Sequence, residues 1–232
     1  PSPREWWGEW MVSADQGKTW TGRRKLPDHG IGPVKNKPIE RPDGTILCGS
    51  STEDRLIGWR VHFELTRDAG RTWSRIGPIN DGNRIAAIQP TILAHRNGRL
   101  QILCRNRNGR GDILQSWSTD DGKSWSQLEA SGLPNPNSGI DAVTLADGRQ
   151  LLVYNHTHRD GPPPRGRAML NVAVSDDGRR WSAALELERA DQGEFSYPAV
   201  IQTRDRRVHI TYTWHRRRVR HVVLDPARLK PI

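Results

Sequence analysis

A repeated eight-residue motif constrains the fold of this 232-residue chain more than any other feature. It has the pattern Ser/Thr-x-Asp-x-Gly-x-Thr/Ser-Trp and occurs at residues 13–20, 66–73 and 118–125. A fourth copy keeps the Asp, the Gly and the Trp. Successive copies end 53, 52 and 56 positions apart, at Trp20, Trp73, Trp125 and Trp181. A regular period of about fifty residues is typical of proteins assembled from repeated supersecondary units.

Local chemistry explains the composition of the motif. The Asp and Ser/Thr side chains can exchange hydrogen bonds with the backbone of a tight turn, and the Gly can adopt a positive φ that other residues resist. The acids of the four copies are Asp15, Asp68, Asp120 and Asp176. We interpret them as turn-closing residues rather than catalytic acids, and we expect each Trp to anchor its turn between neighbouring sheets.

A second repeat lies out of phase with the first and predicts β-hairpins. Extended runs flank tight turns at Pro42-Asp43-Gly44, Arg96-Asn97-Gly98, Ala146-Asp147-Gly148 and Arg204-Asp205-Arg206. The third residue of each turn follows the preceding motif Trp by 24, 25, 23 and 25 positions. Each period therefore contains four antiparallel strands, and no helical periodicity interrupts them. We predict an all-β fold without a long helix, a β-propeller of four-stranded blades.

The blades can be assigned along the chain. Residues 5–25 supply the last two strands of one blade, whole blades occupy 33–80, 84–130 and 138–188, and 194–225 give three more strands. We expect one domain over residues 1–232, with between four and five blades. The constant phase between the two repeats predicts that the motif turns lie at the end of the blades opposite any ligand site.

Composition narrows the partners. The formal charge of +10, from 36 Lys and Arg against 26 Asp and Glu, favours anionic partners. The arginines are spread along the chain rather than gathered in a basic helix or arm, so no nucleic-acid partner is predicted. The densest basic run, residues 215–218, is interpreted as a solvated hairpin tip.

Cysteine usage and hydropathy exclude other classes. Cys48 and Cys104 are the only cysteines, which excludes a disulfide framework and a Cys-rich zinc site, and we expect two buried free thiols at similar places in different blades. No apolar run approaches the ~20 residues that span a membrane, so no membrane span is predicted. No signal peptide opens this sequence, and a leader in a longer parent chain would direct the protein out of the cytoplasm.

Two sets of polar residues mark one end of the blades. Aligning the four hairpins gives one set near the start of the inner strands: Lys37, Gln89, Asp141 and Tyr197. A second set lies seven residues after each turn: Ser51, Arg105, Asn155 and Thr213. A packed β core does not need such residues, so we expect them to line a ligand site at the channel mouth. Alternatively, these residues are polar only because they line a water-filled channel, without binding a ligand.

The motif resembles the Asp box of the sialidase-like superfamily of BNR/Asp-box repeat propellers. Members of that superfamily form six-bladed rings, which would need ~300 residues at this period. The resemblance therefore implies a propeller that is incomplete in this chain and lacks its N-terminal blade or blades. Unpaired edges of the first and last blades would favour self-association.

The resemblance extends to single residues. One hairpin of the family carries a Glu that polarises a nucleophilic Tyr and, sixteen residues later, an Arg that holds the substrate carboxylate. Residues 89–105 resemble this hairpin: Arg105 matches the Arg, and Gln89 stands in place of the Glu. A family pattern R-x-N-L resembles the segment from Arg167, with Met169 in place of Asn. The resemblance implies that both arginines bind the carboxylate.

The nucleophile is assigned in the same way. The family's Tyr lies eight residues before the Asp of a D-G turn, as Tyr197 does before Asp205, although Arg206 replaces the Gly. A tyrosine nucleophile needs activation because its usual pKa is about 10. Gln89 cannot act as the base; Glu53, Asp141 and Glu194 are carboxylates near the same end, for each of which a solvated loop position is the alternative.

The resemblance implies an exo-glycosidase that hydrolyses a terminal acidic sugar, sialic or uronic acid, from a glycan. Tyr197, Arg105 and Arg167 are the predicted catalytic residues. The predicted substrate-binding residues are Lys37, Gln89, Asp141, Glu53 and Asn155. No cofactor or metal is expected, because His156 and His158 have no third ligand suggested by spacing; they could instead form a proton-transfer pair.

Two other functions remain open. The family's third arginine and its Asp general acid belong to blades that this chain does not contain. A polysaccharide lyase acting on uronate-containing glycans is one alternative, mildly favoured by Gln89. A non-catalytic glycan- or protein-binding propeller is the other.

Overall fold

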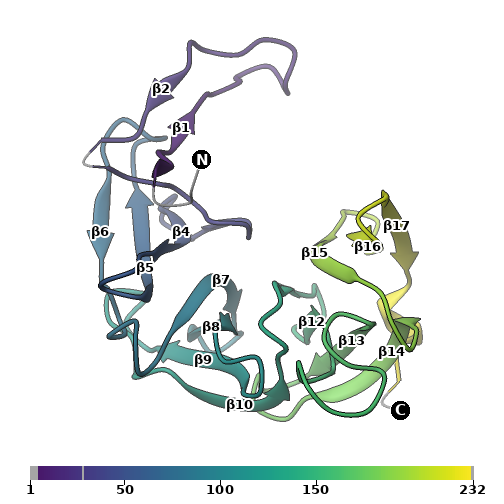
Figure 1. Ribbon diagram of the computed structural model, residues 1–232. Helices are drawn as coiled ribbons and strands as arrows, with labels where there is room; N and C mark the ends of the chain where they lie inside the picture. Colours follow the sequence, from purple (N-terminus) through teal and green to yellow (C-terminus); the bar gives the residue numbers. More distant parts are fainter. Residues whose placement is uncertain (1–4, 28, 231–232) are drawn as a thin grey trace. The chain divides into compact units, whose positions relative to one another are not determined.

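The computed structural model describes residues 5–27 and 29–230. These residues form seventeen β-strands in five antiparallel sheets and contain no α-helix (Figure 1). Contacts divide the chain into two compact units, one reaching Pro90 and the other starting at Thr91. The assignment of a single domain stays a prediction.

The first unit contains one small sheet and one complete blade. The small sheet pairs β1 (Glu9–Trp10) with β2 (Arg24–Lys25). The blade has the order β3 (Ile39–Glu40), β4 (Ile46–Glu53), β5 (Trp59–Thr66) and β6 (Ser74–Ile76). Each strand pairs antiparallel with the next along the chain, as in a propeller blade.

The second unit carries three further sheets in the same chain order. β7 (Ala87–Ala94) crosses the unit boundary and opens a sheet with β8 (Leu100–Asn106), β9 (Asp112–Ser118) and β10 (Glu129–Pro134). The next sheet contains β11 (Asp141–Thr144), β12 (Gln150–Tyr154), β13 (Met169–Ser175) and β14 (Ser182–Arg189). The last contains β15 (Phe195–Gln202), β16 (Val208–Trp214) and β17 (Arg218–Leu224). The predicted blades are confirmed, with ends shifted by a few residues.

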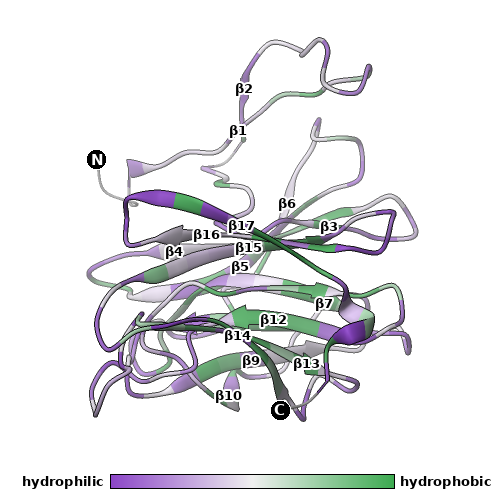
Figure 2. Ribbon diagram, turned by 90° about the vertical axis from the view of Figure 1, so that its right-hand side faces the viewer, coloured by the Kyte–Doolittle hydropathy of each residue, from purple (hydrophilic) through white to green (hydrophobic). Residues whose placement is uncertain are grey.

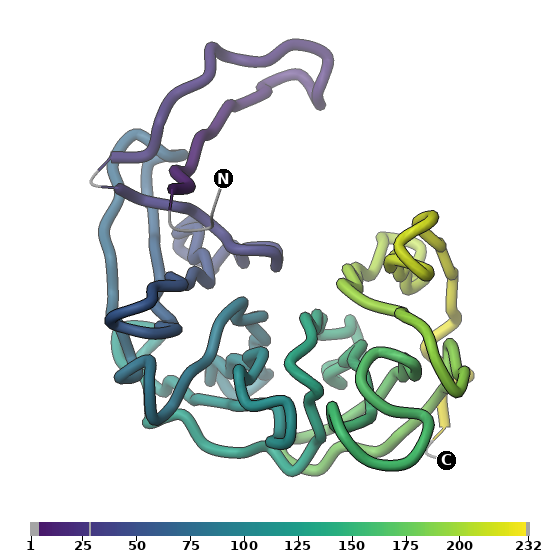
Figure 3. Tube along the Cα trace, viewed as in Figure 1, coloured from purple at the N-terminus to yellow at the C-terminus, as the bar shows by residue number. Residues whose placement is uncertain are grey.

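Within the second unit the first strands lie close together and the last strands lie outside (Figure 1). The chain completes each sheet before it starts the next (Figure 3). Among the described residues β17 has a free edge, where Val219 is exposed. Self-association through such an edge stays a prediction.

Two apolar clusters fill the spaces between these three sheets. One includes Leu93 and Leu103 from the first sheet and Leu152 from the second. The other includes Val172 from the second sheet and Val208 from the third. In Figure 2 the hydrophobic segments lie mostly on the strands and the hydrophilic segments mostly in the loops. Burial between neighbouring sheets, rather than within one sheet, therefore holds this unit together.

The repeated motif closes its turns as predicted. In the third copy, Ser118 Oγ donates to Asp120 (2.8 Å) and accepts from the N–H of Gly122 (2.8 Å). Asp120 also accepts from the N–H and hydroxyl of Ser124 (2.9 and 2.5 Å). The same hydroxyl and backbone bonds hold the pKa of Asp15, Asp68 and Asp120 at about 2. The indole N–H of each motif Trp donates to the Gly carbonyl, at Trp20, Trp73, Trp125 and Trp181.

The fourth copy corrects one assignment made from the sequence. Asp177, not Asp176, takes the box position, where it accepts from Ser175 Oγ (3.1 Å) and from the N–H of Arg179 (2.7 Å). The N–H of Gly178 donates to Ser175 Oγ (2.9 Å), three residues earlier, whereas in the other three copies the Gly and the Ser or Thr are four residues apart. The assignment of Asp176 was wrong because it assumed equal spacing, whereas this turn is one residue shorter.

The box turns and Tyr197 lie at opposite ends of the sheets. β13 begins two residues after Arg167 and ends at Ser175, where the fourth box starts. The N–H of Phe195 donates to the carbonyl of Arg167 (2.8 Å), which places the start of β15 at the Arg167 end. Tyr197, two residues further on, therefore belongs to that end, as the phase of the two repeats predicted.

Both cysteines are free, buried thiols, as predicted. Cys48 lies in β4 and Cys104 in β8, the second strands of their sheets. Burial raises the pKa of Cys48 to about 12 and also raises the pKa of Cys104. Neither thiol therefore ionises readily.

Candidate active site

Three elements of the second unit bring the predicted catalytic residues together. Arg105 lies near the end of β8, Arg167 just before β13, and Tyr197 near the start of β15. Antiparallel neighbours place these positions at one end of their sheets. The guanidinium carbon of Arg167 lies 5.1 Å from the centre of the Tyr197 ring. Both arginines lie close enough to the tyrosine for their charges to act on its phenol. Their roles in catalysis stay predictions.

The backbone at Tyr197 is unusual. It has a φ of 51°, and the pairing of β15 with β16 shifts register between Ser196 and Ala199. A positive φ is rare for a bulky residue, and a bulge of this kind re-aims a side chain out of the regular pleat. The ring is 41% exposed. The strand is thus distorted at the position that presents this phenol.

Asn137 couples the two arginines. Arg105 Nε donates to Asn137 Oδ1 (2.7 Å), and Arg167 Nη2 donates to the carbonyl of Asn137 (3.3 Å). Asn137 itself has a φ of 61° in the loop between β10 and β11. One loop residue therefore orients two guanidinium groups that come from different sheets.

Glu194 anchors the other side of the cluster. Its carboxylate accepts from Arg167 Nη1 (3.0 Å), Arg216 Nε (2.7 Å) and Ser196 Oγ (2.7 Å). Burial alone would raise the pKa of Glu194, but the bonds from Ser196, Arg216 and Arg167 outweigh burial and lower it. Glu194 is therefore an ionised residue that positions Arg167.

The arginines also change the acidity of Tyr197. Burial acts to raise the pKa of this phenol, but the positive charges and hydrogen bonds of Arg105 and Arg167 outweigh it and lower the pKa below its usual value. The other two tyrosines behave in the opposite way. Burial raises the pKa of Tyr154, and burial together with Glu188 raises that of Tyr212 to about 12.

Tyr197 is therefore expected to ionise before Tyr154 and Tyr212 on an alkaline titration. The tyrosinate absorbance of the wild type minus that of Tyr197→Phe should show one titration step at a pH below the ordinary tyrosine pKa of about 10. Arg105→Met should move this step to higher pH, because removing a cation disfavours the phenolate. If the absorbance difference titrated at or above the ordinary tyrosine pKa, the two arginines would not be lowering the pKa of Tyr197.

Other predicted residues have structural contacts. Asp141 is 2% exposed and accepts hydrogen bonds from Thr91 Oγ1 (3.0 Å) and from the N–H of Ala142 (2.9 Å) and of Val200 (2.8 Å). It thus ties β7, β11 and β15 together. The structure places it in the interior, and its role in ligand binding stays a prediction.

Arg105, Asn155 and Ser51 belong to the polar set that lies seven residues after each hairpin turn. Each of them forms a hydrogen bond to the segment that starts the next sheet. Asn155 Nδ2 donates to the carbonyl of Phe195 (2.8 Å), just as Arg105 bonds Asn137 ahead of β11. In the first unit Ser51 Oγ accepts from the N–H of Gln89 (3.1 Å). Polarity at these positions therefore has a structural reason that the sequence analysis did not identify: it connects successive sheets.

The remaining predicted residues belong to the first unit. Lys37 precedes β3, and Glu53 ends β4, where it pairs with Trp59. Gln89 lies in β7 with a φ of 58°, and its carbonyl accepts from Asn36 Nδ2 (2.8 Å). A positive φ followed by proline is thus common to Gln89 and Tyr197, the equivalent positions of the hairpin alignment.

Sequence reasoning missed three contributors to the cluster: Asn137, Ser196 and Arg216. Arg216 lies in the basic run interpreted as a solvated tip, yet it binds Glu194. Asn137 and Ser196 belong to no repeat. His156, considered for proton transfer, hydrogen-bonds to the hydroxyl of Tyr154, and burial, followed by the charge of His158, lowers its pKa.

The chain is a sialidase-like β-propeller. Its four-stranded blades have the box turns at one end and this polar cluster at the other, and these two features define that class of protein. It belongs to the family described as the BNR repeat-like domain, whose model matches residues 1–210. No helix among the described residues is long and apolar enough to cross a membrane.

Relatives agree with this class. A sialidase of Bacteroides fragilis (strain YCH46) is 21% identical over 235 residues, covering 95% of this chain and 41% of that protein. The chain thus spans less than half the length of this curated relative. Two solved structures are similar in fold: a Hadza microbial sialidase (TM-score 0.75, 19% identity, 95% of this chain and 44% of that one) and the NanB sialidase of Streptococcus pneumoniae (TM-score 0.69, 16% identity, 95% and 36%).

Proposed function

We propose that this chain carries part of the active site of a sialidase-like exo-glycosidase that hydrolyses a terminal acidic sugar, sialic or uronic acid, from a glycan. The observation that carries the proposal is the convergence of Arg105 and Arg167 on the phenol of Tyr197. The three residues come from three sheets and are separated by 62 and 30 positions, so no local reason brings them together.

The two arginines suit a carboxylate. A guanidinium offers paired N–H donors in a plane that matches a carboxylate, and such charge-assisted bonds are stronger than neutral ones. Asn137 and Glu194 orient the two groups without neutralising both of them. The carboxylate of an acidic sugar would accept from both guanidinium groups beside the Tyr197 ring.

Tyr197 is the proposed nucleophile toward the anomeric carbon. The arginines lower its pKa, which favours the phenolate without a carboxylate base at Gln89. Glu194 holds Arg167 and contributes through that residue. The general acid that protonates the leaving sugar oxygen has to come from outside the cluster of Arg105, Arg167 and Tyr197.

A lyase that acts on uronate-containing glycans is the second candidate. Two observations favour it: Gln89 stands where the sialidase pattern has Glu, and a tyrosine of lowered pKa can also accept the proton in a β-elimination. In that reaction the arginines would neutralise the uronate carboxylate.

Product analysis distinguishes the two. The full-length protein is incubated with a sialylated oligosaccharide and, separately, with a uronate-containing oligosaccharide. Release of a free acidic monosaccharide without new ultraviolet absorbance supports the hydrolase. An unsaturated product that absorbs in the ultraviolet indicates the lyase. Turnover of neither, with retained binding of acidic sugars, would contradict both and indicate a binding propeller.

A further inference from the structure

A polar cleft of about 390 Å³ lies at the box end of the second unit, at the opposite end of the sheets from Tyr197. It is lined by the β7–β8 turn (residues 95–99), the β11–β12 turn (147–149), the fourth box (176–179) and Trp117 of β9. Its volume falls within the ~300–1,000 Å³ range of small-ligand sites. Nothing in the proposed function uses this cleft.

Arginine dominates the lining. Four arginines face three aspartates: Arg96, Arg99, Arg149 and Arg179 against Asp147, Asp176 and Asp177. Two of the three acids are already occupied. Asp147 accepts from Arg149 Nε (3.0 Å) and Nη2 (2.8 Å), and Asp177 closes the box turn through backbone N–H groups. The cleft therefore keeps an excess of positive charge.

Two of these guanidinium groups lie over one indole. The guanidinium carbons of Arg99 and Arg179 lie 4.6 Å and 5.0 Å from the Trp117 ring centre. Neither group has an ion pair with a carboxylate among the described residues, and Arg99 Nε is buried there without a hydrogen-bond partner. Trp117 is only 7% exposed, so the two cations, not the ring, meet a ligand.

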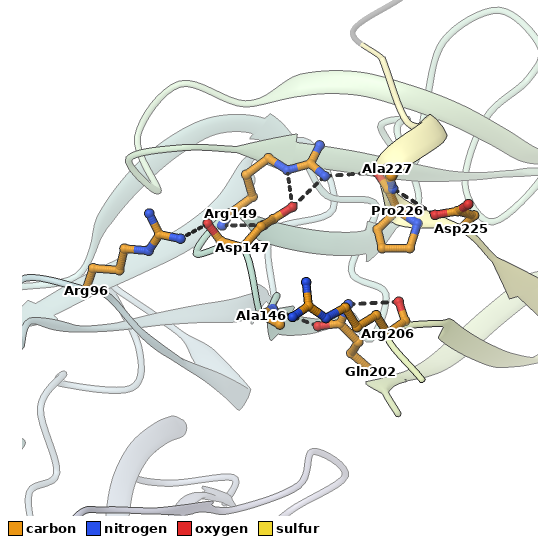
Figure 4. A network of polar contacts seen from close by, with 9 residues as sticks. All are labelled: Arg96, Ala146, Asp147, Arg149, Gln202, Arg206, Asp225, Pro226 and Ala227. Atoms are coloured by element: carbon orange, nitrogen blue, oxygen red, sulfur yellow. Dashed lines mark hydrogen bonds and ion pairs between the residues drawn. The ribbon is translucent and has the colours of Figure 1, made fainter. Parts of the chain in front are cut away.

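The walls of the cleft are held in place. Figure 4 shows the β11–β12 turn anchored on both sides: Arg96 donates to the carbonyl of Asp147, and Arg149 donates to the carbonyl of Pro226 (2.9 Å). The N–H of Ala146 donates to Gln202 (2.7 Å) in the next sheet. On the other wall Gln101 Nε2 donates to the carbonyl of Gly178 (2.7 Å). The turns are thus fixed by three sheets, which lowers the ordering cost of binding.

We propose that this cleft is a second binding site, for an acidic saccharide whose carboxylate or sulfate is held by Arg99 and Arg179. Two guanidinium groups that line one cleft and have no carboxylate partners are complementary to an oxyanion. Asp176, which also lines the cleft, would repel a bare multivalent anion but accepts hydrogen bonds from sugar hydroxyls. This combination favours an acidic saccharide over free phosphate.

The test is calorimetric titration of the full-length protein with four probes: a sulfated disaccharide, an unsulfated uronate disaccharide, the neutral parent disaccharide and inorganic phosphate. Arg179→Gln and Arg99→Gln should each weaken binding of at least one acidic disaccharide about tenfold or more. Arg204→Gln is the matched control, since Arg204 is exposed in the β15–β16 turn and does not line the cleft. It should change affinity less than about twofold.

Folding and independence from the other site are checked in the same series. Thermal unfolding reports whether each variant folds, and Arg179→Gln, at an exposed turn position, carries the test if Arg99→Gln does not fold. Because the proposed site at Arg105 also takes acidic sugars, the titrations are repeated in the Arg105→Met background, in which Arg179→Gln should still weaken binding of an acidic disaccharide about tenfold or more. The proposal would be overturned if Arg204→Gln lost as much affinity for the acidic disaccharides as Arg179→Gln does. It would also be overturned if phosphate bound more tightly than either acidic disaccharide, or if neither acidic disaccharide bound.

Discussion

Replacing Arg105 with methionine is expected to weaken binding of an acidic sugar by about 10- to 150-fold. The loss corresponds to about 1.5–3 kcal/mol, the usual contribution of a hydrogen bond to a charged group. Methionine keeps most of the aliphatic stem, so the change removes the charge and the donors rather than the packing. Calorimetric titration of the wild type and the variant with sialic acid and with a uronic acid measures it.

A neutral sugar of the same size provides the control. Its affinity should change little, because it has no carboxylate for the guanidinium to hold. Arg167→Met should show the same selectivity, and its effect should be mimicked in part by Glu194→Gln, which weakens the anchor of Arg167. Equal losses for the acidic and the neutral sugar would mean that Arg105 supports the structure and not the ligand.

Asp141→Ala is expected to destabilise the second unit by about 3–5 kcal/mol. The change removes a buried carboxylate that accepts three hydrogen bonds. The N–H of Val200 and the hydroxyl of Thr91 then lose the oxygen to which they donate. Chemical denaturation followed by tryptophan fluorescence measures the loss. Asp141→Asn should cost less, because its amide oxygen still accepts.

Asp191→Ala serves as the matched control for this change. Asp191 is exposed in the loop between β14 and β15, and its loss should alter stability by no more than about 0.5 kcal/mol. If Asp141→Ala behaved like the control while sugar binding fell, Asp141 would be a ligand-binding residue, as the hairpin alignment predicted, and not a connection between sheets.

The fold could be predicted because its signals are local and repeated. A box turn and a hairpin turn each depend on a few adjacent residues, and their constant phase determines the strand order. The one error in the boxes, Asp176 for Asp177, arose where a residue is missing from the turn. Spacing alone cannot show which of two adjacent acids meets Ser175, because that depends on the path of the backbone.

The site could be predicted only in part. Family patterns predict Arg105, Arg167 and Tyr197, and the structure brings them close together at one end of their sheets. Asn137 and Arg216 belong to no pattern, since their contacts join segments far apart in the chain. Asn155 and Asp141 form hydrogen bonds between sheets, a structural reason for buried polar residues that spacing does not reveal; their role in ligand binding stays a prediction.

The most direct test of the proposed site is the structure of the full-length protein bound to sialic acid or to the uronic acid that it binds best. We predict that the carboxylate of the sugar lies within hydrogen-bond distance of both Arg105 and Arg167, with the anomeric carbon facing the hydroxyl of Tyr197. A sugar bound elsewhere, or one whose carboxylate contacts neither arginine, would contradict the proposed site.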